Sequence, residues 1–234
     1  MAQLDLICLA NSPKMGGRCV AGLRVDGKGW VRPIAKDTDH GQLYSFHYRL
    51  KNDSDPEILD VIKVSLEERR PSTGQPENWI IGKDPWLLVA RPLNPNLYKI
   101  LGSALVPGPR LLGSTGRRVS EKDIDQVSAS LALISPSKLR FFLEPDFSNR
   151  LQPRASFELK GQYYDLPITD PSWITLIVRK LEPLDRAGHT QEAIGISRDR
   201  EILFTVSLGE AFRGYCYKLV AGIVVLPAGL KLSA

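Results

Sequence analysis

Cysteine and histidine are scarce in this 234-residue chain, which contains three of each. The cysteines, Cys8, Cys19 and Cys216, form no Cys-x-x-Cys pair, and an odd number does not fit a disulfide framework. The histidines have neither the HExxH pattern nor the paired spacing of metal ligands. The sequence therefore predicts a reduced compartment, no metal site and no cofactor.

Long apolar runs are missing as well. The first residues have no basic segment followed by an apolar one, so we expect no secretory signal peptide. The longest apolar run near the other end, 219–226, is far shorter than the about 20 residues that cross a bilayer. We expect a cytoplasmic protein with no membrane partner.

Catalytic motifs are also absent. No serine lies in a GxSxG pattern, and the glycine-containing turn at 11–18 leads into a predicted strand, whereas a nucleotide-hydrolase loop opens a helix. The sequence names no catalytic residue, and a binding protein is favoured over an enzyme.

What the chain does have is an uneven distribution of charge. Residues 1–118 hold 17 Lys and Arg against 12 Asp and Glu, a net of +5, whereas residues 119–234 hold 14 of each. A polyanion would approach the first half, because Lys and Arg displace condensed counterions from phosphates. The alternative is a basic surface that only keeps the protein in solution.

The pattern of apolar residues and turns predicts a mainly β protein with short helices. Glycines at 26–29 separate two strands of a hairpin, and a Pro and Gly-rich stretch at 94–118 marks a domain boundary. A helix is predicted at 171–181, capped by Asp170 or Thr169, with Pro171 in its first turn. Predicted strands cover 4–10, 18–25, 30–34, 58–66, 86–90, 130–134, 154–160, 162–168, 202–208 and 215–226. This organisation favours an α+β fold of two small barrels, residues 1–118 and 119–234.

Two segments near the N-terminus are candidates for binding phosphate or bases. The polar turn at 11–18 carries Lys14 and Arg18 beside backbone amides that suit a phosphate, although an ordinary solvated loop has the same composition. Period-two alternation in the following strand places Arg18 and Arg24 on one face, beside Trp30 and Arg32 of the partner strand. We expect this face to point outward and to bind nucleic acid, unless Trp30 closes the barrel as a core residue.

A third candidate is the predicted loop 69–79. Gln75 and Asn78 both donate and accept hydrogen bonds, which suits recognition of a base edge, and Trp79 is suited to stacking on the base. The alternative is that Gln75 and Asn78 tie the loop to its own backbone. The basic stretch 112–118 is interpreted as a linker. In the last strand, alternation places Tyr215 and Tyr217 on one face.

Several segments together resemble the bacterial dual OB-containing domain family. They are Cys-Leu-Ala-Asn-Ser at 8–12, Gly-Arg-Cys-Val-Ala-Gly at 17–22, Gly-Trp-Val-Arg-Pro at 29–33, Gln-Pro-Glu-Asn at 75–78, and the segments 164–170, 205–210 and 216–219. The resemblance implies two tandem OB-like barrels in proteins of anti-phage and conflict systems, with nucleic acid or a nucleotide as ligand.

Three functions stay open at this point. The first is a module that binds single-stranded nucleic acid through Lys14, Arg18, Arg24, Trp30, Arg32, Gln75, Asn78 and Trp79. The second is a sensor of, or an enzyme acting on, a small nucleotide or modified base held in a pocket of the N-terminal half. The third is an adaptor for a protein partner, which the same defence system would encode.

Overall fold

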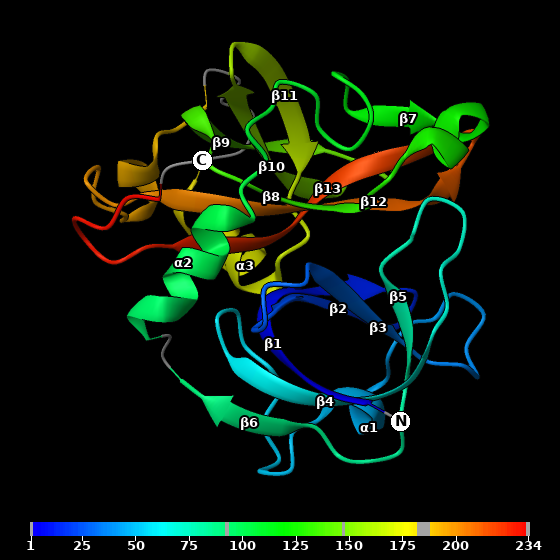
Figure 1. Ribbon diagram of the computed structural model, residues 1–234. Coiled ribbons are helices and arrows are strands. Elements are labelled where there is room, and N and C mark those ends of the chain that lie inside the picture. Colours follow the sequence, from blue (N-terminus) through cyan, green and yellow to red (C-terminus); the bar gives the residue numbers. More distant parts are fainter. Residues whose placement is uncertain (1, 92–93, 147, 182–187, 233–234) are drawn as a thin grey trace.

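The computed structural model describes residues 2–91, 94–146, 148–181 and 188–232. They form a closed β-barrel, built from the N-terminal strands, and a curled half-barrel, built from the C-terminal strands and called the second barrel below; the two are stacked one on the other (Figure 1). This arrangement confirms the predicted mainly β fold of two tandem OB-like units.

The first barrel is closed by five strands. Their order is β1-β2-β3-β5-β4, and β4 pairs back onto β1 to close the ring. All neighbours are antiparallel except β3 and β5, which run parallel. This is a Greek-key barrel of the OB type. The strands are Ala2–Lys14, Gly17–Arg24, Trp30–Ile34, Val61–Arg69 and Asn78–Ile81 for β1 to β5, with β6 (Leu87–Ala90) beside β4 and the helix α1 (Ser45–Tyr48) between β3 and β4.

The second barrel repeats this order in two curled sheets. One sheet is β11-β10-β9 and the other is β7-β13-β12-β8. Since β8 leads directly into β9, these two strands together take the place of β1, and a parallel bridge between Ile168 and Val220 joins β11 to β13. The strands are Arg118–Ser120, Leu131–Ile134, Ser137–Pro145, Leu151–Leu159, Gln162–Pro167, Ile202–Phe212 and Tyr215–Val225 for β7 to β13.

The helices show where local sequence signals were sufficient and where they were not. The predicted helix is α3 (Pro171–Lys180), and Asp170 caps it by accepting hydrogen bonds from the amides of Ser172 and Trp173. A second helix, α2 (Pro95–Ser103), lies in the Pro and Gly-rich stretch 94–118, for which no helix was predicted. It begins there because Asn94 caps it and Pro95 occupies its first turn, where a missing N–H costs nothing. Two 3-10 helices, Glu121–Gln126 and Gln191–Ile194, complete the described helical segments.

Strand limits were the weaker part of the prediction. The first strand does not end at residue 10. It bends at a bulge between Cys8 and Ala10 and continues to Lys14, so the segment 11–13 belongs to the hairpin with β2. The turn is only Met15 and Gly16, both with positive φ. Strand β9 was not predicted at all.

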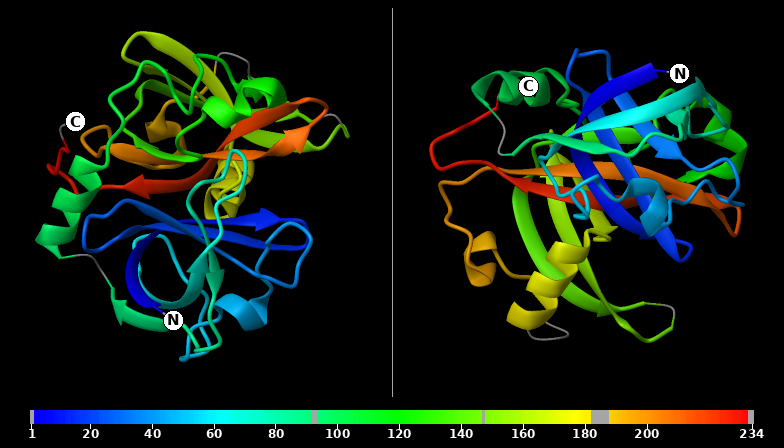
Figure 2. Two further views of the ribbon diagram at one scale, coloured as in Figure 1. Left: turned by 45° about the vertical axis from the view of Figure 1, so that its right-hand side comes forward. Right: turned by 90° about the horizontal axis from the view of Figure 1, so that it is seen from below.

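The barrels share a buried interface, because both faces of β1 and β2 are covered. Val20 packs inside the first barrel, whereas Ile7 and Leu23 pack in a cluster that also contains Leu203 and Val224 of the second barrel. The prediction that the face of β2 with Arg18 and Arg24 points outward is therefore wrong over its middle, where Val20 lies inside the barrel, and Trp30 lies on the other face, opposite Leu23. In Figure 2 the two barrels lie directly against each other.

Glycine is required at one point of this contact. A Cβ at Gly222 would lie 2.0 Å from the carbonyl oxygen of Leu9, so β13 approaches the backbone of β1 only because residue 222 has no side chain. Leu111 and Leu112 precede residue 118 and yet pack in the core of the second barrel. The division of domains at residue 118 stays a prediction.

Candidate nucleic-acid interface

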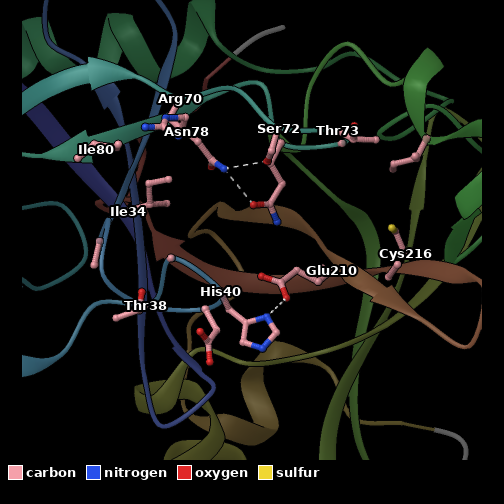
Figure 3. A pocket seen from close by; sticks show the side chains of 18 of the residues that line it. Ile34, Thr38, His40, Arg70, Ser72, Thr73, Asn78, Ile80, Glu210 and Cys216 are labelled. Atoms are coloured by element: carbon pink, nitrogen blue, oxygen red, sulfur yellow. Dashed lines mark hydrogen bonds and ion pairs between the residues drawn. The ribbon is translucent and has the colours of Figure 1, made fainter.

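A cavity of about 670 Å³ lies on one side of the contact between the barrels (Figure 3). The first barrel contributes the segment 34–41 and the loop between β4 and β5, and the second contributes the 3-10 helix at 121–126 and the ends of β12 and β13. The loop between β4 and β5 reaches across to the second barrel, where Gly74 lies against Ile124. We call this space the inter-barrel cavity.

Gln75 and Asn78 both line the inter-barrel cavity. Asn78 and Trp79 are the first residues of β5, so the predicted loop is shorter than expected. The side-chain amide of Asn78 donates to Ser72 Oγ and to Gln75 Oε1, both at 3.2 Å (Figure 3). These bonds tie the loop to itself, through side chains instead of the backbone, while leaving Gln75 beside the cavity.

Arg32 is not on the surface, contrary to prediction. It is 1% exposed, because the outer face of β3 is covered by the second barrel. Its guanidinium donates to Ser130 Oγ at 2.9 Å and to Ser207 Oγ at 3.2 Å. The buried carboxylate of Glu77 accepts hydrogen bonds from the amide and the hydroxyl of Ser130, at 2.7 and 2.6 Å.

Ser130 therefore bridges the two buried charges. The Arg32 side chain also lies 3.5 Å from Asn78 Oδ1, so this polar network is directly behind one wall of the cavity. Arg32 acts as a connection between the barrels and does not contact the cavity itself.

Lys14 reaches the cavity through an ion pair. Its ammonium lies 2.7 Å from Glu210, and His40 Nδ1 lies 2.6 Å from the same carboxylate (Figure 3). Burial raises the pKa of Glu210, but the bonds from Lys14 and His40 outweigh it and hold that pKa below its ordinary value. Glu210 thus joins β12 of the second barrel to two segments of the first.

The other predicted binding residues are dispersed. Arg24 pairs with Asp26 in its own turn, at 2.9 Å between Nε and Oδ1. Trp30 is half-buried against the apolar clusters between the barrels. Trp79 packs against the core of the first barrel, with the Arg69 guanidinium 5.8 Å from its ring, and Arg18 lines a separate hollow of about 340 Å³. None of these four residues lines the inter-barrel cavity.

A second feature lies around Tyr215 and Tyr217, which alternation in the sequence had already placed on one face. Arg118, in β7, pairs with Tyr217 of β13, and its guanidinium lies 3.7 Å from the ring centre of Tyr215. At the tip of the β12–β13 hairpin, the Arg213 guanidinium lies 5.1 Å from the ring centre of Phe212, which is 54% exposed. We call these five residues the arginine–aromatic surface.

The interpretation of 112–118 as a linker was wrong for Arg118, which begins a strand. The alternation of Tyr215 and Tyr217 was visible in the sequence, but nothing local indicated that Arg118 would pair beside them. Arg110 and Arg118 line a further hollow of about 560 Å³ next to this surface.

Both features lie at equivalent places in the two barrels. The loop 70–77 joins the fourth and fifth strands of the first barrel, and the turn 213–214 joins those of the second. OB domains bind oligonucleotides with this loop, the loop between strands one and two, and the face of strands two and three. In the first barrel that face is covered by the second barrel, so the loops between strands four and five are the accessible elements near the inter-barrel cavity.

Other kinds of site find little support within the described parts of the chain. No three His, Cys, Asp or Glu residues among them lie close enough to hold a metal ion. None of their helices is long and apolar enough to cross a membrane. Burial raises the pKa of the Cys8 thiol to about 12, which makes it a poor nucleophile.

Comparison with known proteins assigns the family. The model of the dual OB-containing domain family matches residues 4–223, nearly the whole chain. No curated protein matches the sequence. Among solved structures, a murine DNA-binding protein bound to double-stranded DNA is similar with a TM-score of 0.35 and 9% identity, over 97% of this chain and 100% of that one. That score carries no argument about binding, but the family match, in accord with the strand order of both barrels, shows that this chain belongs to the dual OB-containing domain family.

Proposed function

We propose that this protein is a nucleic-acid-binding module that holds a single strand on the arginine–aromatic surface. The observation that carries the proposal is the stacking of Arg118 on Tyr215, at the loop between strands four and five of the second barrel. A guanidinium placed over an aromatic ring keeps its N–H edges available for phosphate, and the neighbouring rings offer faces for bases.

The positions of exposed arginines support binding of nucleic acid at the arginine–aromatic surface. Arg110, Arg117 and Arg118 are exposed and precede residue 119, so they supply three of the five excess positive charges in the first half of the sequence. Arg118 nevertheless pairs with the second barrel, and Arg110 lies beside it. Part of the basic character that the sequence assigns to the first barrel therefore lies on or beside the arginine–aromatic surface.

The test is direct binding of a labelled single-stranded oligonucleotide of mixed sequence, measured by fluorescence anisotropy at low salt. We expect saturable binding, weakened at least tenfold by Arg118→Ala combined with Arg213→Ala, since base–aromatic stacking and phosphate contacts each contribute about 1–3 kcal/mol. The matched control is Arg179→Ala with Arg198→Ala, which removes two exposed arginines elsewhere on the second barrel. No binding by the unmodified protein would refute the proposal.

A second candidate is a sensor or enzyme for a small nucleotide or modified base, and the inter-barrel cavity is the observation in its favour. Its volume of about 670 Å³ falls within the roughly 300–1,000 Å³ of small-molecule sites. A thermal shift with a mononucleotide that oligonucleotides do not reproduce would select it. The adaptor function, a protein partner and a role in anti-phage defence stay predictions, and copurification of a stoichiometric partner after nuclease treatment would support them.

A further inference from the structure

The inter-barrel cavity has a lining that suits a base more than a phosphate. On the side of the first barrel it presents hydroxyl and amide groups, from Thr38, Ser72, Thr73, Gln75 and Asn78. Such groups match the donors and acceptors on the edge of a nucleobase. Gln75 is the best placed of them, because its side chain lies at the cavity and is held there by Asn78.

The charges around the cavity disfavour an anion. Carboxylates line it at Asp39, Glu121, Asp125 and Glu210, whereas the Lys and Arg side chains that line it are Lys36 and Arg70. Arg70 is already paired with Glu68 at 3.0 Å, and Lys14 and His40 offset only Glu210. A phosphate group inside the cavity would face more negative than positive charge, while an uncharged ligand carries no such penalty.

The carboxylates also indicate which bases would be preferred. Glu121 and Asp125, on the 3-10 helix, line the cavity together with the polar side chains of the loop between β4 and β5. Carboxylate oxygens accept hydrogen bonds from exocyclic amino groups, as in the pairing of Glu or Asp with the N4 amino group of cytosine. Thymine and uracil present carbonyl oxygens at the corresponding position.

From these observations we infer that the inter-barrel cavity takes one unstacked base with an exocyclic amino group, while the phosphates stay outside on the arginine–aromatic surface. This inference rests on the proposed function, because the base would belong to the bound strand. It assigns separate tasks to the two features. Base preference resides in the cavity, and the salt-dependent attraction resides on the surface.

The experiment compares hexanucleotides by competition anisotropy. In a dT6 background, replacing one thymine by cytosine should raise affinity about tenfold, the effect of one good base contact, and a second cytosine should add little. An abasic position at one site should cost little, because another base can occupy the cavity. Equal affinity of dT6 and its single-cytosine variant, within twofold, would overturn the inference and leave the proposed function intact.

Substitutions in the protein test which residues cause the preference for cytosine. Gln75→Ala should remove the cytosine preference without changing the salt dependence of dT6 binding, because the phosphates lie on the arginine–aromatic surface. Gln162→Ala, at the first residue of β11, is the matched control and should keep the cytosine preference. Glu121→Gln with Asp125→Asn tests the carboxylates at two exposed positions, so a loss of folding does not confuse the result. A cytosine preference that survives both Gln75→Ala and the carboxylate variant would contradict the assignment.

Free nucleosides distinguish failure of this inference from failure of the proposed function. If no oligonucleotide binds at low salt, the proposed function fails, and cytidine and cytidine 5′-monophosphate then test the cavity alone by calorimetry. Cytidine binding at least as tightly as its monophosphate is the expected result. Tighter binding of the monophosphate, or no binding of either compound, would overturn the inference.

Discussion

Replacing Arg32 by methionine tests whether the two barrels are held together by a buried charge. The substitution keeps an apolar side chain of similar length but removes the guanidinium that donates to Ser130 and Ser207. The carboxylate of Glu77 would then remain buried, with its two bonds from Ser130 but without the guanidinium that Ser130 connects to it. We expect a large loss of stability.

The magnitude follows from the contacts. Two hydrogen bonds from a charged donor contribute about 1.5–3 kcal/mol each, and the desolvation cost of Arg32 itself is regained when it is removed. Removing one partner of a buried ion pair lowers the free energy of unfolding by about 3–5 kcal/mol. Because Glu77 keeps its hydrogen bonds with Ser130, we expect a smaller loss for Arg32→Met, about 2–4 kcal/mol. For a chain of this size that corresponds to a drop in Tm of roughly 4–16 °C.

The assay is urea and thermal unfolding followed by circular dichroism. Arg24→Met is the matched control, because Arg24 lies in the same hairpin and only pairs with Asp26 at the surface, a contact of about 0–1 kcal/mol. Adding Glu77→Gln to Arg32→Met should recover stability, since it removes the uncompensated charge. Two results would refute this account of the interface. One is an equal loss of unfolding free energy in Arg32→Met and Arg24→Met, and the other is a double variant that is no more stable than Arg32→Met.

Two further predictions concern backbone contact and pH. Gly222→Ala should lower the free energy of unfolding by more than about 2 kcal/mol, because its Cβ would meet the Leu9 carbonyl oxygen. Gly116→Ala, whose Cβ would lie at an ordinary contact distance of 4.0 Å from the Arg118 carbonyl oxygen, should change it little, and urea unfolding measures both. Burial, with a smaller contribution from Arg110, lowers the pKa of Lys218 from 10.5 to about 7. Between these pH values the unfolded chain binds a proton that the folded protein has released, so stability should rise with pH from 7 to 10, and Lys218→Met should flatten that rise in the urea midpoint. A slope unchanged in Lys218→Met would contradict the assignment to this residue.

Local signals were sufficient for much of the fold. The glycines at 26–29 indicated the β2–β3 hairpin, and Asp170 followed by Pro171 indicated α3, because turns and caps depend on residues adjacent in sequence. The helix α2 carries the same kind of signal in Asn94 and Pro95, but the surrounding prolines and glycines outweighed it in the prediction.

The orientation of side chains was harder to predict from the sequence, because it depends on contacts between distant segments. Alternation separates the two faces within each strand, but it assigned them wrongly between the strands: Trp30 pairs with Leu23, so Trp30 and Arg32 lie on the face opposite Arg18 and Arg24, and the second barrel covers that face. That cover is what buries Arg32 and half-buries Trp30. The meeting of Arg118 with Tyr215 likewise depends on the pairing of β7 with β13. Gln75 and Asn78 were predicted as base-binding residues from their chemistry alone, and the structure places both at the inter-barrel cavity.

The measurement that tests the central claim most directly is the salt dependence of single-strand binding. The logarithm of affinity should fall linearly with the logarithm of salt concentration, with a slope of about −0.7 for each phosphate contacted. Arg118→Ala with Arg213→Ala should reduce the magnitude of that slope by about 1.4, while Arg179→Ala with Arg198→Ala should leave it unchanged. Equal slopes for the unmodified protein and both double variants would contradict the claim that the arginine–aromatic surface holds the strand.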